Sequence, residues 1–219
     1  MQQLNLGEQL RKAAHVLKEN FSIFFVLSFL GNILFIGNAV FVPVLRRTIY
    51  DGILFLLANI VFIWSVMAII YATSKIFKGE KVTLPEAFQQ RPGTLVRFFF
   101  SCILYLFLTF IGILLFVIPG VYLGTVFSLS YLPVILENKG IIEGFTISRN
   151  LIKGYFWPML LLGTVLVFCF VFFCILVEFA GVFKIALTGL IGIFYVAYVT
   201  ILEFFVYNRL KEIKAQETT

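Results

Sequence analysis

Two acidic side chains lie inside long apolar stretches of this sequence, where an ionised group is costly. Glu178 and Glu203 are the only carboxylates within the predicted membrane spans, and an intramembrane carboxylate is by default a candidate for proton or substrate transfer. Both lie near the ends of their spans, however, where a long side chain can reach the aqueous boundary. Glu203 also shares a helix face with Thr200. We favour structural pairing of Glu203 with Arg97 or Lys153 at the inner boundary, with a relay as the alternative.

The side chains that catalysis needs are sparse in this chain. His15 is the only histidine, and no His, Cys and acidic residues cluster with metal-ligand spacing. Asp51 is the only aspartate, which excludes a pair of catalytic aspartates. No phosphate-binding GxxxxGK[ST] motif occurs, and Ser128 and Ser130 have no base nearby in sequence. The sequence therefore predicts no enzyme activity, no catalytic or metal-binding residue and no cofactor.

Two amides and one carboxylate are the candidate polar positions inside the membrane. Asn32 and Asn38 interrupt the first apolar run, and both are expected to face other helices because an amide in hydrocarbon needs a partner. Together with Glu203 they could line an internal cavity. Separately, small residues at every fourth position predict close helix packing in the fourth span. This stripe consists of Gly120, Gly124 and Ser128.

Composition explains why so few residues can do chemistry. Hydrophobic residues make up 61% of the 219 residues and charged residues only 13%, against roughly half and a quarter in soluble domains. The apolar runs are about twenty residues long without period-two alternation, which predicts transmembrane helices and not barrel strands. The net charge of +6 is spread over the ends of these runs, which indicates membrane topology and not nucleic-acid binding. The predicted fold is all-α, with a single transmembrane domain.

Six spans, joined partly through short amphipathic helices at the membrane surface, account for this pattern. Pro119-Gly120 is the natural place for a tight reversal between the third and fourth spans, and Pro133 is expected to kink the fourth. The tail after residue 207 reads as polar and frayed. The predicted spans are 21–44, 53–76, 95–118, 121–136, 155–179 and 185–207, and the predicted surface helices are 4–20, 84–91 and 141–153.

Lysine and arginine indicate the orientation in the membrane. Fourteen of the seventeen lie in the N-terminal segment, in two of the connections and in the tail. Only Arg46, Arg47 and Lys184 lie in the opposite connections. By the positive-inside rule, both termini are expected in the cytoplasm.

The three predicted surface helices share an acidic start. Glu8, Glu86 and Glu143 are each followed by apolar residues at the same spacing and then by two spans, which indicates a pseudo-threefold repeat of surface helix plus hairpin. The alternative is that any such helix needs an acidic first turn and an apolar anchor. The matching apolar residues are Leu10, Leu17 and Phe21; Phe88, Leu95 and Phe99; and Phe145, Ile152 and Phe156.

Residues 119–158 combine a Pro-Gly turn, an acidic-polar pair after an apolar helix, a short helix with an early glutamate, and a Lys-Gly-x-Phe-Trp start to the next span. These elements are Pro119-Gly120, Glu137-Asn138, Glu143, Lys153-Gly154 and Phe156-Trp157. The pattern resembles that of the YciC-like bacterial inner-membrane proteins and of the related membrane domain of some glycerophosphodiester phosphodiesterases. The resemblance implies a protein of the bacterial cytoplasmic (inner) membrane. No phosphodiesterase domain accompanies it here, so a hydrolase activity is not implied.

Together these observations predict a non-enzymatic membrane protein that acts in envelope or membrane-lipid homeostasis as a lipid-interacting scaffold or accessory subunit. Its expected partners are anionic membrane lipids and an unidentified membrane protein, not nucleic acid. The alternative is a small transporter or lipid carrier with an intramembrane cavity around the polar positions and the kinked fourth span. Basic residues on the surface helices are the candidate contacts for lipid headgroups. They are Arg11, Lys12, Lys18, Arg149 and Lys153.

Overall fold

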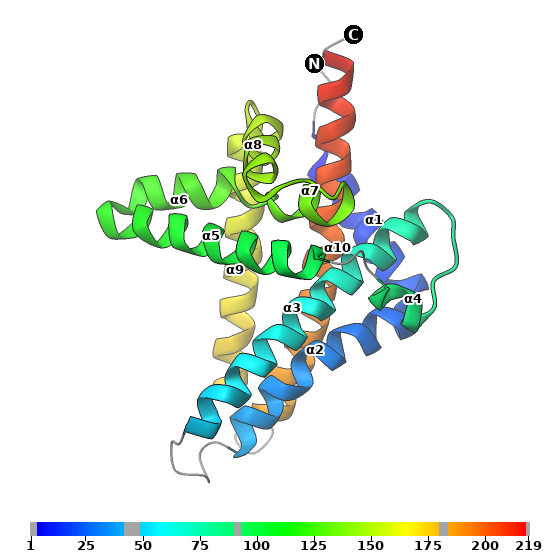
Figure 1. The fold of residues 1–219 in the computed structure, drawn as a ribbon, viewed down its shortest axis with the longest axis vertical. Helices are drawn as coiled ribbons and strands as arrows, with labels where there is room; N and C mark the ends of the chain where they lie inside the picture. Colours follow the sequence, from blue (N-terminus) through cyan, green and yellow to red (C-terminus); the bar gives the residue numbers. More distant parts are fainter. Residues whose placement is uncertain (1–3, 42–48, 90–92, 180–183, 218–219) are drawn as a thin grey trace. The chain divides into compact units, whose positions relative to one another are not determined.

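The computed structural model describes residues 4–41, 49–89, 93–179 and 184–217 (Figure 1). All regular structure in these ranges is helical. Five helical segments there are long and apolar enough to cross a membrane, or six if the bent pair of α1 and α2 counts as one span. The predicted all-α, multi-pass architecture is confirmed. The helices are α1 (Leu6–Glu19), α2 (Phe21–Phe41), α3 (Ile49–Phe77), α4 (Leu84–Phe88), α5 (Thr94–Leu115), α6 (Val117–Val126), α7 (Tyr131–Leu136), α8 (Ile141–Ile152), α9 (Phe156–Glu178) and α10 (Lys184–Glu217).

Two compact units make up the chain. The first consists of Met1–Lys12, Gln90–Val165 and Leu202–Thr219, and the second of Ala13–Gln89 and Leu166–Ile201. Helices α1, α9 and α10 each contribute residues to both units. Neither unit is therefore one continuous stretch of sequence.

The hairpin of α2 and α3 forms the packed centre of the second unit. Gly31 on α2 approaches α3 so closely that a Cβ at this position would lie 2.8 Å from the Ser65 Cβ. The Ser65 hydroxyl donates a hydrogen bond to the Leu27 carbonyl, which satisfies a polar group in an apolar core. The same two helices carry fully buried apolar residues, among them Phe24, Met67, Ile69 and Ile70.

The hairpin of α5 and α6 belongs to the first unit, and Figure 1 shows its two helices side by side. The chain reverses at Phe116, whose extended backbone (φ −162°, ψ 145°) separates the two helices. The predicted reversal at Pro119-Gly120 is therefore wrong by about one helical turn. Pro119 lies instead in the first turn of α6, where its missing N–H leaves no hydrogen bond unmade. Gly120 is needed for close packing, since a Cβ there would lie 2.5 Å from the backbone nitrogen of Ile113.

The fourth predicted span is broken, but not at its proline. Helix α6 ends at Val126 and α7 begins at Tyr131, with a turn between them. Pro133 lies in the first turn of α7, which tolerates proline, so the expected kink at Pro133 is wrong. At the break, the Ser128 hydroxyl donates to the Thr125 carbonyl at 2.9 Å, and this bond replaces one that a continuous helix would make.

The surface helices meet the spans at defined corners. The axis of α1 turns by 92° into that of Phe21–Ile33, as expected for a surface helix that leads into a span. The carboxylates of Glu86 and Glu143 accept hydrogen bonds from the backbone N–H groups of Thr83 (3.1 Å) and Gly140 (3.3 Å), each three residues upstream. Two of the three proposed repeats thus begin with the same local geometry, while the repeat itself stays a prediction.

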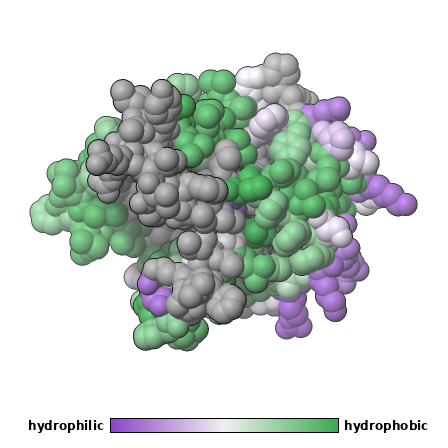
Figure 2. Space-filling view, turned by 90° about the horizontal axis from the view of Figure 1, so that it is seen from below, coloured by the Kyte–Doolittle hydropathy of each residue, from purple (hydrophilic) through white to green (hydrophobic). Residues whose placement is uncertain are grey.

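Large apolar side chains are widely exposed on the spans. Ile118 at the α5–α6 turn is 83% exposed, and Leu106, Phe110 and Leu114 on α5 are also largely exposed. Figure 2 shows hydrophobic residues over much of the coloured part of the visible surface. In water such a surface would favour aggregation, whereas in a bilayer it is the surface that lipid covers.

The C-terminal tail is not frayed as the sequence predicts, because α10 continues to Glu217. Ion pairs within one turn support its end: Arg209 with Glu212 at 3.0 Å and Lys214 with Glu217 at 2.7 Å. Side-chain pairs at this spacing stabilise a helix. The polar composition of the tail is therefore that of a helix extending beyond the membrane boundary.

Candidate functional site

A hollow of about 340 Å³ opens where α8 turns into α9 beside α6. We call it the basic hollow, because two of the predicted headgroup contacts, Arg149 and Lys153, line it together. The other lining residues are Tyr122, Val126, Asn150, Ile152, Gly154 and Phe156. All of these residues belong to the first unit.

Helix α8 is held in place by small residues on its buried face. Gly144 packs against the turn before α7 so tightly that a Cβ would lie 2.5 Å from the Ser130 carbonyl oxygen. The buried Ser148 hydroxyl donates a 2.7 Å hydrogen bond to the carbonyl of Val126 at the end of α6. These two contacts fix the rotation of α8 about its own axis. Arg149 follows Ser148 directly and is therefore presented on the exposed side.

The corner between α8 and α9 completes the hollow. Gly154 adopts the left-handed region with φ of 93°, which other residues adopt only at a cost, and the Tyr155 N–H bonds back to the Ile152 carbonyl at 2.8 Å. The turn brings the centroid of the Phe156 ring to 5.5 Å from the centroid of the Tyr122 ring on α6. Two aromatic rings thus form a wall beside the cations.

The cations of the basic hollow form no ion pair with another described residue. Among the residues that the structure describes, no carboxylate forms an ion pair with exposed Arg149 or Lys153. Other basic residues are paired: Lys12 lies 2.7 Å from Glu8 and Lys211 lies 2.8 Å from Glu137. Unpaired cations at the level where a span begins attract an anionic group from outside the protein.

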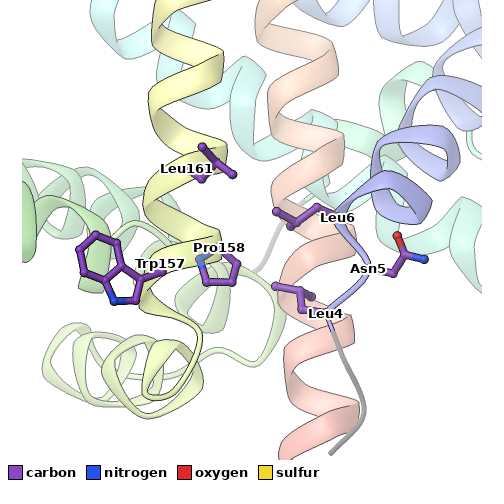
Figure 3. Close-up of a pocket in the computed structure, with 6 residues that line it drawn as sticks. All are labelled: Leu4, Asn5, Leu6, Trp157, Pro158 and Leu161. Atoms are coloured by element: carbon purple, nitrogen blue, oxygen red, sulfur yellow. The ribbon is translucent and has the colours of Figure 1, made fainter.

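A second hollow, of about 740 Å³, lies on the opposite flank of the first turns of α9, against the start of α1. We call it the Trp157 hollow. Figure 3 shows Leu4, Asn5 and Leu6 across from Pro158 and Leu161. Polar and apolar atoms contribute about equally to its lining, and Trp157 is 75% exposed. An exposed tryptophan at the start of a span is typical of the membrane interface.

The remaining predicted headgroup contacts lie on α1 and do not join either hollow. Arg11, Lys12 and Lys18 are exposed. Lys12 is held by Glu8 one turn away, and this contact lowers the pKa of Glu8 through the hydrogen bond and the charge of Lys12. The structure thus brings together two of the five predicted contacts. The residue that sequence reasoning missed is Tyr122, because its ring contact with Phe156 depends on how α6 and α9 pack.

The hydrogen-bond partner of Glu203 is a tyrosine, whereas the sequence predicts a cation. The Tyr131 hydroxyl on α7 donates a hydrogen bond to Glu203 on α10. Arg97 instead donates to the Asn138 carbonyl at 3.2 Å, and Lys153 lines the basic hollow. The predicted cation partners are therefore wrong, because α7 and not an inner connection lies against this turn of α10. The pairing is a hydrogen bond between helices.

A second bond of the same kind lies one turn farther along α10. The Tyr207 hydroxyl donates to Glu137 at the end of α7, and the Lys211 ammonium lies 2.8 Å from the same carboxylate. Burial raises the pKa of Glu137, but hydrogen bonds from Lys211 and Tyr207 outweigh it, so the pKa is lowered from its ordinary value of 4.5. The α7 segment and α10 thus each contribute one tyrosine and one glutamate to these two hydrogen bonds. We call Tyr131, Glu137, Glu203 and Tyr207 the tyrosine–carboxylate lock.

Of the other candidate intramembrane positions, Asn32 serves helix packing. The Asn32 amide donates to the Ser28 carbonyl of its own helix at 2.8 Å, and its oxygen would lie 3.4 Å from a Cβ at Gly192 on α10. Asn32 therefore faces another helix, as predicted. The side chain of Asn38 lies outside the described residues. Glu178 is exposed as the last residue of α9.

The small-residue stripe is divided by the break in the fourth span. Gly120 packs against Ile113 on α5, and a Cβ at Gly124 would lie 3.3 Å from the Thr109 methyl group. Ser128 lies beyond the end of α6 and bonds to its own segment. Two of the three positions therefore bring helices together.

Within the described ranges, no group of three His, Cys, Asp or Glu side chains could hold a metal ion. What the basic hollow can do follows from its cations, its rings and its place at the start of a span. In comparisons with known proteins, no family model, curated protein or solved structure matches this chain.

Proposed function

We propose that this chain is a non-enzymatic protein of the bacterial cytoplasmic membrane that binds anionic lipid headgroups. It would act as a scaffold or accessory subunit in envelope or membrane-lipid homeostasis, together with an unidentified membrane protein partner. The observation that carries this proposal is the basic hollow, where Arg149 and Lys153 lie side by side without a described carboxylate partner.

The placement of these cations supports the proposal energetically. A lysine or arginine near an anionic membrane surface contributes about 1 kcal/mol of attraction. A cation paired within the protein loses much of this, because its glutamate repels the same anion. The neighbouring rings of Tyr122 and Phe156 and the exposed Trp157 favour the interfacial depth at which lipid phosphates lie.

The distribution of lysine and arginine along the chain supports a cytoplasmic position for the basic hollow. Arg149 and Lys153 belong to the connections that hold most of the lysine and arginine, so the basic hollow would face the cytoplasmic leaflet. The resemblance of residues 119–158 to YciC-like proteins covers every residue that lines the hollow and supports the same placement. A reporter that is active only in the cytoplasm should be active when it is fused to the C-terminus. Activity there of a reporter that works only outside the cytoplasm would refute this orientation.

The direct test is the lipid that stays with the protein during mild purification. Mass spectrometry should find anionic phospholipid enriched over its share of the membrane, and Arg149→Gln with Lys153→Gln should remove most of that enrichment. The matched control is Arg209→Gln with Lys214→Gln, which removes two cations that are paired with glutamates. A lipid composition equal to that of the bulk membrane, or an equal loss in the control, would refute the headgroup site.

A further inference from the structure

The two cations of the basic hollow lie one helical turn apart. Arg149 and Lys153 are four positions apart, and the Lys153 N–H bonds to the Arg149 carbonyl at 3.0 Å. Like charges at this spacing are neighbours on the helix surface and repel each other. The only carboxylate of α8 is Glu143, which accepts the Gly140 N–H at the other end of the helix. Within α8, the repulsion between the two cations is therefore not relieved.

The other walls of the hollow add no negative charge. Helix α6 has no charged residue, and the first turn of α9 has no acidic residue. The two helices instead contribute the rings of Tyr122 and Phe156. A ligand that neutralises both cations must therefore carry two negative charges of its own.

Two uncharged side chains of the lining can donate hydrogen bonds. Asn150 follows Arg149 and lies three positions before Lys153, so it shares their face of α8. Neither the Asn150 amide nor the Tyr122 hydroxyl forms a hydrogen bond with another described residue. The hollow thus presents four kinds of donor: a guanidinium, an ammonium, an amide and a hydroxyl.

Phosphate esters differ in the charge and in the number of free oxygens that they offer to such donors. A phosphate monoester has three terminal oxygens and a charge of about −1.5 to −2 at neutral pH. A phosphodiester has only two terminal oxygens and a single charge. A guanidinium binds two oxygens at once as a fork, and a monoester then has a third oxygen for the ammonium. The monoester matches the basic hollow in both charge and donors.

We propose that the basic hollow selects lipids whose headgroup is a phosphate monoester, as in phosphatidic acid, over phosphodiester lipids such as phosphatidylglycerol. The inference rests on the headgroup site proposed above and names its ligand class. The second charge of the monoester meets a second cation, and each lysine or arginine near an anionic surface contributes about fivefold in affinity. The monoester lipid should therefore bind about fivefold more tightly.

The test compares two lipids that differ by one methyl group. Phosphatidylmethanol is phosphatidic acid with a methyl ester on its phosphate, so it lacks one charge and keeps the same acyl chains. The protein in neutral detergent is given an equimolar mixture at a pH about two units above the second pKa of a phosphate monoester, which is about 6. Native mass spectrometry separates the two complexes by mass. Wild type should bind phosphatidic acid in about fivefold excess, and a ratio near one would overturn the proposal.

Variants test whether the preference arises in the hollow. Arg149→Gln and Lys153→Gln, made singly, should each bring the ratio close to one, because a single cation gives the second charge no partner. The matched control is Arg11→Gln with Lys18→Gln, which removes two exposed cations of α1 that lie outside the hollow. This control should keep the wild-type ratio. A ratio that survives in both single variants, or that is lost in the control, would overturn the assignment to the basic hollow.

Soluble phosphate esters share the chemistry of this headgroup, and a competition experiment distinguishes the two sources. Glycerol 3-phosphate carries the same monoester without acyl chains. At the concentration of the lipid it should displace little phosphatidic acid from the wild-type protein. Displacement of most of the lipid would identify a soluble ester as the ligand and refute a lipid headgroup site.

The outcome also distinguishes this inference from the function on which it rests. Anionic lipid that is retained in dependence on Arg149 and Lys153, combined with a ratio near one, refutes the monoester preference and leaves the headgroup site standing. Absence of both retention and preference refutes the two together. Retention and a preference that both depend on these cations support both.

Discussion

The tyrosine–carboxylate lock and the basic hollow lie in the same unit and use charge in opposite ways. In the lock, Glu137 and Glu203 each accept a tyrosine hydroxyl, and Lys211 neutralises Glu137. In the hollow, Arg149 and Lys153 remain exposed without a described carboxylate. Charges satisfied within the chain hold helices together, whereas charges left open are available to a ligand. Substitutions at the lock should therefore change stability, and substitutions in the hollow should change lipid binding.

The largest effect is expected where both regions depend on the same contact. Gly144→Ala places a methyl group 2.5 Å from the Ser130 carbonyl oxygen, so α8 must move away from the turn before α7. We expect a loss of about 3 kcal/mol in the free energy of unfolding, measured by thermal unfolding in detergent, and reduced retention of anionic lipid. Gly163→Ala on α9 has nothing within 4 Å and should be neutral. Equal stability of the two variants would contradict the close packing of α8.

Tyr131→Phe should have the next largest effect, and it acts on the lock alone. The variant removes the hydroxyl that donates to Glu203 and leaves a partly buried carboxylate without this donor. We expect a loss of about 2 kcal/mol in the same unfolding measurement, with lipid retention unchanged in the folded protein. Tyr122→Phe, on the wall of the basic hollow, is the matched control. If it destabilises the protein as much as Tyr131→Phe does, the lock has no special role.

Acid should weaken the second bond of the lock in a predictable direction. The pKa of Glu137 is lowered from 4.5 in the folded protein, so its ionised form stabilises the fold above that pH, and this contribution disappears as the pH falls through the lowered pKa. At neutral pH, Glu137→Gln should be less stable than wild type by about 1 kcal/mol. The difference in unfolding temperature should shrink below pH 4.5. Parallel pH profiles for the two proteins would show that Glu137 contributes no linked stability.

The smallest change in stability is expected in the basic hollow. Arg149→Gln with Lys153→Gln removes two exposed cations that hold no described partner. The free energy of unfolding should change by less than about 0.5 kcal/mol, measured in detergent without added anionic lipid. With anionic lipid present, wild type should gain stability that the double variant does not gain. A large loss without lipid would place these side chains in the fold instead of in a binding site.

The parts of this fold that the sequence predicts are those set by local pattern. Helix type, the positions of most spans and the amphipathic character of α1 and α8 follow from apolar periodicity, and the early glutamates of α4 and α8 mark their starts. The break at Phe116 was not predicted from the sequence, because phenylalanine is not a residue type that indicates a turn. After this turn Gly120 approaches Ile113 closely across the hairpin, a contact that depends on how the two helices pack. Proline suggested a reversal at Pro119 and a kink at Pro133, yet both residues fit into the first turn of a helix.

Long-range partners were the least predictable part of the candidate site. The sequence places Glu203 near a membrane boundary but does not reveal which helix lies against it, and Tyr131 is 72 positions away. For the basic hollow, Arg149 and Lys153 could be chosen from their place on a surface helix. Tyr122 could not be chosen from the sequence, because the place of its ring beside Phe156 depends on how α6 and α9 pack.

The turn at Phe116 has a consequence for how this protein is made. From Phe98 to Leu136 the sequence has no charged residue. At the turn, the Phe116 N–H bonds to the Gly112 carbonyl and the Gly120 N–H to the Phe116 carbonyl, at 3.0 and 3.3 Å. With these groups satisfied, the turn can enter hydrocarbon. During synthesis no hydrophilic loop between α5 and α6 has to be moved across the bilayer, so the two helices can leave the insertion machinery as one preformed pair.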